Sequence, residues 1–218
     1  MRRPMKQPSR FRVLTIIFQE REYGGFYSYF ERYSSDLSSR GVEVYIFTNS
    51  LRALPHDKLR RKLHVHPIVT KHKFIFAVRC TFSATLLAIR RRINIIHAFA
   101  PITAFFGTLL KVVTGGRTVV SIRSNWWLEY GYKRSSARSC IGKIVYWLYP
   151  ALGVIALKLS DAVTTVTNEQ KTLVAQITTK PIEVIPNVVD ISRFNPNVKS
   201  DRLRHEYGLI DKHIIMFL

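Results

Sequence analysis

The sequence predicts an α/β domain of the Rossmann-like, doubly wound kind, in which a mostly parallel sheet is covered by helices on both faces. Residues 11–18 (FRVLTIIF) form a continuous apolar run, which is typical of strands buried on both faces. Strand-like runs then alternate with helical patterns along the chain, and parallel strands require such crossover connections. Hydrophobic residues make up 47% of the chain, enough to build a substantial core.

The predicted elements follow one another as strand, helix and strand. After the strand at 11–18, five apolar side chains recur at helical spacing on one face: Phe26, Tyr29, Phe30, Tyr33 and Leu37. Gly41 ends this helix, and a strand follows at 42–48. We expect further strands at 93–99, 118–122, 162–166 and 182–185, preceded in turn by helices at about 77–92, 102–113, 140–159 and 169–177.

Three regions are expected along the chain: a basic tail at 1–10, an N-terminal domain at 11–196, and a linker with a new strand at 197–218. At 218 residues the chain is longer than a typical single domain and shorter than two. Its last apolar stretch begins at 213, where a second domain would start. We therefore expect one domain of a two-domain architecture, truncated at the start of the second.

The chain is strongly basic, with 34 Lys and Arg against 14 Asp and Glu and a formal net charge of +20. Such a surface favours anionic partners without choosing among nucleic acid, membrane and phosphorylated substrates. The arginines form no recognition helix or RNA-binding motif, so nucleic acid is not an expected partner. The two isolated cysteines, Cys80 and Cys140, and an apolar stretch at 13–18 that is too short for a signal peptide favour a cytoplasmic protein.

An apolar segment at 144–157 is interrupted by Pro150 and Gly153 and is shorter than the roughly 20 residues that cross a bilayer. Basic clusters lie at 58–62, 90–92 and 133–138. Together these features indicate a surface that contacts the cytoplasmic face of an anionic membrane peripherally. A helix that simply packs in the core is the alternative.

His64 and His66 alternate as they would on one face of a strand. No carboxylate or cysteine lies close to them in sequence, and no Asp-x-Asp motif occurs anywhere in the chain. A partly exposed edge strand therefore explains these histidines better than a metal site does.

Gly24 and Gly25 follow the first predicted strand and open the first helix. At such a position, backbone N–H groups and the helix dipole can receive a phosphate. No complete GxGxxG or P-loop motif accompanies them, so a pair of turn glycines without a ligand is equally compatible with the spacing.

Residues 121–129 (SIRSNWWLE) come at the end of the strand at 118–122, where open α/β sheets bind their ligands. Arg123 and Asn125 are able to contact phosphate or sugar hydroxyl groups, and Trp126 or Trp127 is able to stack on a sugar ring. A tryptophan pair in the core is the structural alternative.

Several segments, in order, resemble the N-terminal domain of glycosyltransferase family 4. They are Gly24-Gly25, 40–44 (RGVEV), 94–99 (NIIHAF), 119–124 (VVSIRS), 160–163 (SDAV) and 185–190 (IPNVVD) with Phe194 and Pro196. The resemblance spans about 12–218, and its most specific part is 185–196. The family often has a His at the position of Arg123, a Gly at that of Val188, and a second His at that of Phe99.

The resemblance implies a two-domain GT-B fold and the transfer of a sugar from a nucleotide-sugar donor to a glycan or lipid-linked acceptor. It also implies retention of the anomeric configuration, with no metal and no cofactor other than the donor as co-substrate. The present domain would bind the acceptor, through His97, Asn125, Trp126 and Glu129. It would be inactive without the domain that holds the donor.

The resemblance further implies that Gly24 and Gly25 approach the donor diphosphate. Arg123 would be the catalytic residue, because its permanent positive charge can stabilise the departing phosphate although it is a poor base. A non-catalytic basic module that binds an anionic membrane or a partner protein is the alternative function.

Overall fold

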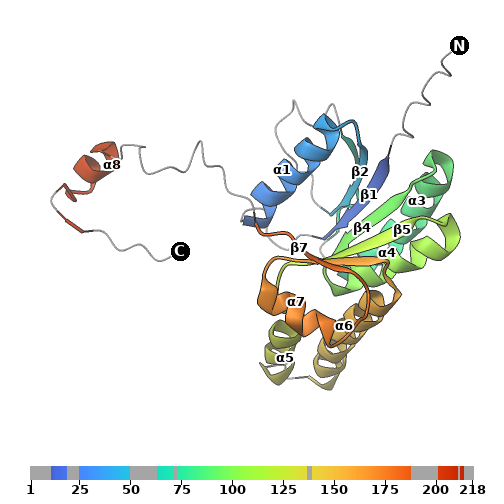
Figure 1. Ribbon diagram of the computed structural model, residues 1–218. Helices are drawn as coiled ribbons and strands as arrows, with labels where there is room; N and C mark the ends of the chain where they lie inside the picture. The colour runs from blue at the N-terminus through green and yellow to red at the C-terminus, as the bar shows by residue number, and fades with distance from the viewer. Residues whose placement is uncertain are drawn as a thin grey trace, which may run out of the picture. The chain divides into compact units, whose positions relative to one another are not determined.

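The computed structural model describes residues 11–18, 25–49, 63–70, 73–136, 139–187, 201–210 and 212–213. Within these residues one sheet contains seven strands, all parallel, in the order β3-β2-β1-β4-β5-β6-β7 (Figure 1). The strands are β1 (Arg12–Ile17), β2 (Glu43–Thr48), β3 (His64–Pro67), β4 (Ile95–Phe99), β5 (Arg117–Ile122), β6 (Ala162–Thr165) and β7 (Ile182–Val184). The predicted α/β class is confirmed, and the strands predicted between residues 11 and 185 each lie within two residues of their expected bounds.

The helices are α1 (Gly25–Ser39), α3 (Lys73–Arg91), α4 (Pro101–Thr114), α5 (Trp126–Ser136), α6 (Cys140–Leu159), α7 (Asn168–Ala175) and α8 (Asp201–Glu206). Helix α1 packs on one face of the sheet. Helices α3, α4, α6 and α7 pack on the other face, and α5 packs on α6 (Figure 1). This sidedness follows from right-handed crossovers, because the chain moves outward from β1 to β3 and then returns to add β4 to β7 on the other side.

The central strands are buried on both faces, as the continuous apolar run at 11–18 predicts. Leu14 and Ile16 of β1 belong to a cluster with the inner side of α3. Ile17, on the opposite face, packs in a cluster with Phe30 of α1 and Ile46 of β2. Burial on both faces selects apolar residues at every position of such a strand, and this is why the run shows no alternation.

Asp161, in the predicted segment 160–163, joins three elements near the start of β6. One carboxylate oxygen lies 2.5 Å from Lys111 Nζ at the end of α4, and the other accepts a hydrogen bond of 2.7 Å from the backbone N–H of Thr118 in β5. Burial would raise the pKa of Asp161, but these interactions outweigh it and hold the pKa below its ordinary value. Asp161 therefore has a structural role at the amino end of the strands.

Helix α6 coincides with the predicted helix at 140–159 and contains Pro150. Gly153 lets neighbouring residues approach it closely: a Cβ built there would lie 2.9 Å from the ring of Trp126 and 3.1 Å from Pro101. Trp126 thus fills the space beside Gly153 and joins α5 to α4 and α6. In the part of the chain that the structure describes, no helix is both long and apolar enough to span a membrane.

The chain divides into two units, Met1–Pro186 and Asn187–Leu218. The sheet and its helices belong to the first, and the second contains the short helix α8. The predicted boundary at 196, the tail at 1–10 and nearly all of the strand predicted from 213 lie outside the described residues.

Substitution Gly153→Ala is expected to lower the free energy of unfolding by about 1 kcal/mol. Overpacking against Trp126 costs about 1–3 kcal/mol, and the higher helix propensity of alanine returns up to about 1 kcal/mol. Gly131→Ala in α5 is the matched control, because a Cβ there meets no atom within 4 Å. It should raise the stability by up to about 1 kcal/mol. Urea unfolding of both variants checks this, and equal stabilisation by the two would contradict the close packing at Gly153.

Candidate functional site

The carboxyl ends of β1, β4 and β5 are where the predicted site residues gather. The sheet adds strands in opposite directions from β1 and β4, and in open α/β sheets ligands bind beside such a reversal at the carboxyl edge. Gly25 is the first residue of α1, Ala100 directly follows β4, and Arg123 directly follows β5. Gly24 lies outside the described residues. The fold therefore brings Gly25 and Arg123 to one edge of the sheet.

The backbone is strained where β4 ends at this edge. Ala100 has φ 65° and ψ 152°, a region that essentially only glycine populates, and it precedes Pro101 at the start of α4. Such a conformation costs about 1–3 kcal/mol and is commonest at functional sites. This strain could not be predicted from the sequence, because a positive φ is expected at glycine and not at alanine.

A chain of four hydrogen-bonded side chains lies beneath the edge, on the α1 face of the sheet. The hydroxyl of Tyr33 in α1 lies 2.6 Å from His97 Nδ1 in β4, and His97 Nε2 lies 2.6 Å from the hydroxyl of Ser121 in β5. The hydroxyl of Ser121 lies 2.5 Å from that of Thr164 in β6. One helix and three neighbouring strands are thereby linked through side chains. We call these four residues the buried polar chain.

His97 is the centre of the buried polar chain and is itself buried. Burial, together with the positive charge of Arg123, lowers its pKa to about 3. His97 is therefore neutral at physiological pH. One ring nitrogen carries the proton and donates, while the other accepts. With both nitrogens engaged inside the protein, His97 holds the elements around it in place.

Two further hydroxyl groups lie in this layer. Thr15 of β1 is aligned with His97 in the strand register, and Ser34 follows Tyr33 in α1. Both side chains are buried, and neither hydroxyl has a hydrogen-bond partner in the described part of the chain. His97 was expected from the sequence to bind the acceptor, but no role at the site was predicted for Tyr33 or Thr164. The sequence feature that could have indicated the buried polar chain is the presence of hydroxyl side chains inside otherwise apolar strands.

The segment after β5 has both exposed and buried residues. Asn125 precedes α5 and its side-chain oxygen accepts a hydrogen bond of 3.2 Å from the backbone N–H of Leu128, so it caps the helix. Glu129 is exposed and lies 2.9 Å from Lys133 Nζ. Trp126 is buried against Gly153 and presents its ring to the core, not to a ligand. The side chain of Trp127 lies outside the described residues.

The histidines at 64 and 66 lie on β3, the edge strand of the sheet, as expected. Their rings stack on aromatic side chains of β2: His64 on Tyr45 and His66 on Phe47. Among the described residues no group of three or more His, Cys, Asp or Glu side chains is arranged to hold a metal ion.

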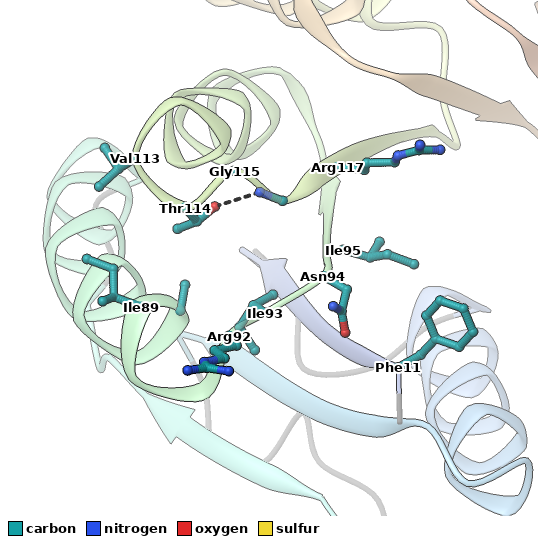
Figure 2. A pocket seen from close by; sticks show the side chains of 12 residues that line it. Phe11, Ile89, Arg92, Ile93, Asn94, Ile95, Val113, Thr114, Gly115 and Arg117 are labelled. Atoms are coloured by element: carbon teal, nitrogen blue, oxygen red, sulfur yellow. Dashed lines mark hydrogen bonds between the residues drawn. The ribbon is translucent and has the colours of Figure 1, made fainter. Parts of the chain in front are cut away.

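A pocket of about 670 Å³ opens at the opposite, amino edge of the sheet (Figure 2). Ile89 and Arg92 near the end of α3, Asn94 before β4, Val113 of α4 and Arg117 of β5 are among the residues that line it. None of the predicted site residues does. In Figure 2, Arg92 and Arg117 lie on different sides of the pocket. The two edges of the sheet are thus chemically distinct.

Several solved structures that share this fold are glycosyltransferases of the two-domain GT-B class. The chain aligns with sucrose-phosphate synthase from Thermosynechococcus elongatus with a TM-score of 0.69 and 13% identity, over 92% of this chain and 53% of that one. A glycosyltransferase from Rickettsia africae gives 0.58 and 15%, over 92% and 50%. HepE from Anabaena, solved with UDP and glucose, gives 0.59 and 12%, over 91% and 50%. The chain therefore spans about half the length of these structures and corresponds to one of their two domains.

The sequence places the chain more narrowly within this class. It matches the model of Glycosyltransferase Family 4 over residues 23–193, and the protein belongs to that family. The family expected from the sequence motifs is therefore confirmed. No protein of curated function has a matching sequence.

His97→Gln should remove a pH dependence from the stability. An unfolded histidine titrates near pH 6.5, whereas folded His97 has its pKa lowered to about 3. The stability from neutral His97 is complete above pH 6.5 and is lost as the pH falls toward 3. Between pH 7 and pH 5 the loss amounts to about 2 kcal/mol.

Urea unfolding at the two pH values, for wild type and variant, measures this contribution. At pH 7 the variant should also be less stable by about 1–3 kcal/mol, because a partner in the buried polar chain becomes unsatisfied. An identical change between pH 7 and pH 5 in both proteins would contradict a buried, neutral His97.

Proposed function

We propose that this protein transfers a sugar from a nucleotide-sugar donor to an acceptor, with retention of the anomeric configuration and without a metal ion. The observation that carries the proposal is the family match over 23–193 in a domain that brings Gly25 and Arg123 to one edge of its sheet. The solved structure of HepE with UDP and glucose is consistent with a nucleotide-sugar as co-substrate.

In this proposal, Gly24 and Gly25 leave room for the donor diphosphate at the start of α1. The unpaired backbone N–H groups of a helix N-terminus, together with its dipole, favour an anion at that position. Side chains at the two glycines would block the approach. Most of the nucleotide would be held by the second domain of the GT-B fold, of which this chain contains little.

Arg123 is the proposed catalytic residue. Its guanidinium remains charged at any physiological pH, so it acts by stabilising the negative charge that grows on the departing phosphate. His97 below it stays neutral and adds no competing positive charge. Ser121 of the buried polar chain lies near the end of β5, the strand that Arg123 directly follows, so the chain holds in place the strand end beside the proposed catalytic residue.

The acceptor is proposed to bind along the segment that follows β5. Asn125 and Glu129 present polar groups there, and a glycan or lipid-linked acceptor could use both. His97 and Trp126 contribute from inside the domain, because His97 fixes the strand ends and Trp126 anchors α5. Their roles are positioning roles, since neither side chain is exposed.

A second candidate function is a non-catalytic basic module that binds an anionic membrane or a partner protein at the cytoplasmic side. The formal charge of +20 and the apolar outer side of α6 favour it. Donor-dependent chemistry distinguishes the two candidates, because a binding module releases no nucleoside diphosphate.

The test is the hydrolysis of a panel of UDP- and GDP-sugars by the full-length protein, in which water takes the place of the acceptor and nucleoside diphosphate is released. Gly24→Val is expected to lower the rate at least about 100-fold, because a branched side chain excludes the diphosphate from the N–H groups that stabilise it. Gly131→Ala, in open space on α5, is the control and should keep the wild-type rate. Undiminished release by Gly24→Val would show that the glycine loop does not bind the donor. Absence of release from every donor would favour the binding module.

A further inference from the structure

Helix α3 carries a stripe of large apolar side chains on its solvent side. The residues recur at spacings of three and four and are all exposed: Ile75, Val78, Phe82, Leu86 and Ile89. Phe82 is 71% exposed. The inner side of the same helix packs on the sheet through Phe76, Cys80, Ala84 and Ala88. The helix is therefore apolar on both sides, although only one of them is in the core.

The two neighbouring helices extend this stripe. Helix α4 packs between α3 and α6 on the same face of the sheet (Figure 1). Its exposed apolar residues are Leu109, Val112 and Val113, and those of α6 are Ile144, Val145, Trp147, Leu148, Ile155 and Leu159. We call the exposed sides of α3, α4 and α6 the outer helical face. Three adjacent helices that each expose several large apolar side chains are unusual for a protein that lies free in solution.

The charges on these helices have one sign. There are four Lys or Arg residues in α3, one in α4 and two in α6, and no Asp or Glu in any of the three. Arg90 and Arg91 end α3, and Arg92 follows at the amino edge beside the pocket, which Ile89 and Val113 also line (Figure 2). The outer helical face is thus both apolar and cationic.

We propose that the outer helical face docks on the surface of an anionic lipid membrane. Apolar side chains can enter the boundary between headgroups and acyl chains, while lysine and arginine side chains bind the lipid phosphates. This pairing accounts for both properties of the face at once. A second copy of the chain would bring two cationic faces together, which the charge opposes. The sequence alone indicated membrane contact through the segment at 144–157, which lies in α6. The structure adds the exposed sides of α3 and α4 to this contact surface.

Docking in this way leaves the candidate site open. The outer helical face runs along the sheet, whereas Gly25 and Arg123 lie at the carboxyl edge of its strands. The site would then face along the membrane surface, where a lipid-linked acceptor presents its headgroup. This last step rests on the proposed transferase function, but the docking itself does not.

The test is cosedimentation of the full-length protein with vesicles of phosphatidylglycerol and phosphatidylcholine, compared with vesicles of phosphatidylcholine alone. Wild type should bind the anionic vesicles and not the neutral ones. Phe82→Glu and Arg90→Glu should each weaken binding at least about tenfold, because one inserts a charge among the apolar residues and the other reverses a cation. Thermal unfolding confirms that each variant is folded.

Matched controls lie outside the three helices of the outer helical face. One control is Val69→Glu, because Val69 follows β3 and is 73% exposed, close to the exposure of Phe82. The other is Arg40→Glu, because Arg40 lies beyond the end of α1, the helix on the opposite face of the sheet. Both should bind the anionic vesicles like wild type. Equal binding by Phe82→Glu and Arg90→Glu would overturn the proposal. So would a wild-type dimer without vesicle binding that Phe82→Glu converts to a monomer, because the face would then be an interface between copies.

Release of nucleoside diphosphate, measured without vesicles, separates the docking proposal from the transferase proposal. Phe82→Glu should keep the wild-type rate, because Phe82 lies in the middle of α3 and none of the proposed site residues belongs to that helix. A protein that binds anionic vesicles through this face but releases no nucleoside diphosphate would sustain the docking and reject the transferase function.

Discussion

The hydrogen bonds from Tyr33 through His97 and Ser121 to Thr164 cross the domain from helix α1 to strand β6. A buried polar group that loses its partner costs more than a made hydrogen bond contributes, so these four side chains constrain one another. Helix α1 must lie where Tyr33 reaches His97, and β4, β5 and β6 must keep a register that brings His97, Ser121 and Thr164 together. These hydrogen bonds therefore hold in place α1, which begins at Gly25, and the end of β5, which Arg123 directly follows.

The two edges of the sheet serve different purposes. At the amino edge, Asp161 binds Lys111 and Thr118 and holds α4, β5 and β6 together. At the carboxyl edge, Ala100 is strained and Arg123 lies next to a histidine that stays neutral. An ion pair with a structural role thus lies at the amino edge, whereas backbone strain lies at the carboxyl edge, where ligands bind in open α/β sheets. The outer helical face is a third surface of the domain, and its apolar side chains are exposed and are not part of the core.

Local patterns in the sequence were sufficient for the fold. The continuous apolar run of β1 and the apolar length of α6 each predict an element, because burial on both sides acts on every residue. The motif at 185–190 and its companions led to the correct family. These signals are short-range, and a single chain displays them directly.

The roles of particular side chains required the structure. From the sequence, His97 was expected to bind a ligand. In the structure both of its ring nitrogens form hydrogen bonds within the protein, and no local pattern indicates this because its partner Tyr33 is distant in sequence. Asn125 and Trp126 are suitable for binding a sugar and equally suitable for capping and packing α5. The outer stripe of α3 went unnoticed because an apolar helix position has the same periodicity whether it faces the sheet or the solvent.

We propose that the carboxyl edge of the sheet receives the nucleotide-sugar. Hydrogen–deuterium exchange of the full-length protein, with and without UDP-glucose and GDP-mannose, tests it most directly. We predict slower exchange in peptides that contain residues 25–30, 99–104 and 122–129, which surround the edge formed by β1, β4 and β5. Slower exchange confined to residues 92–95 and 113–117 would place the ligand in the amino-edge pocket and would contradict the account.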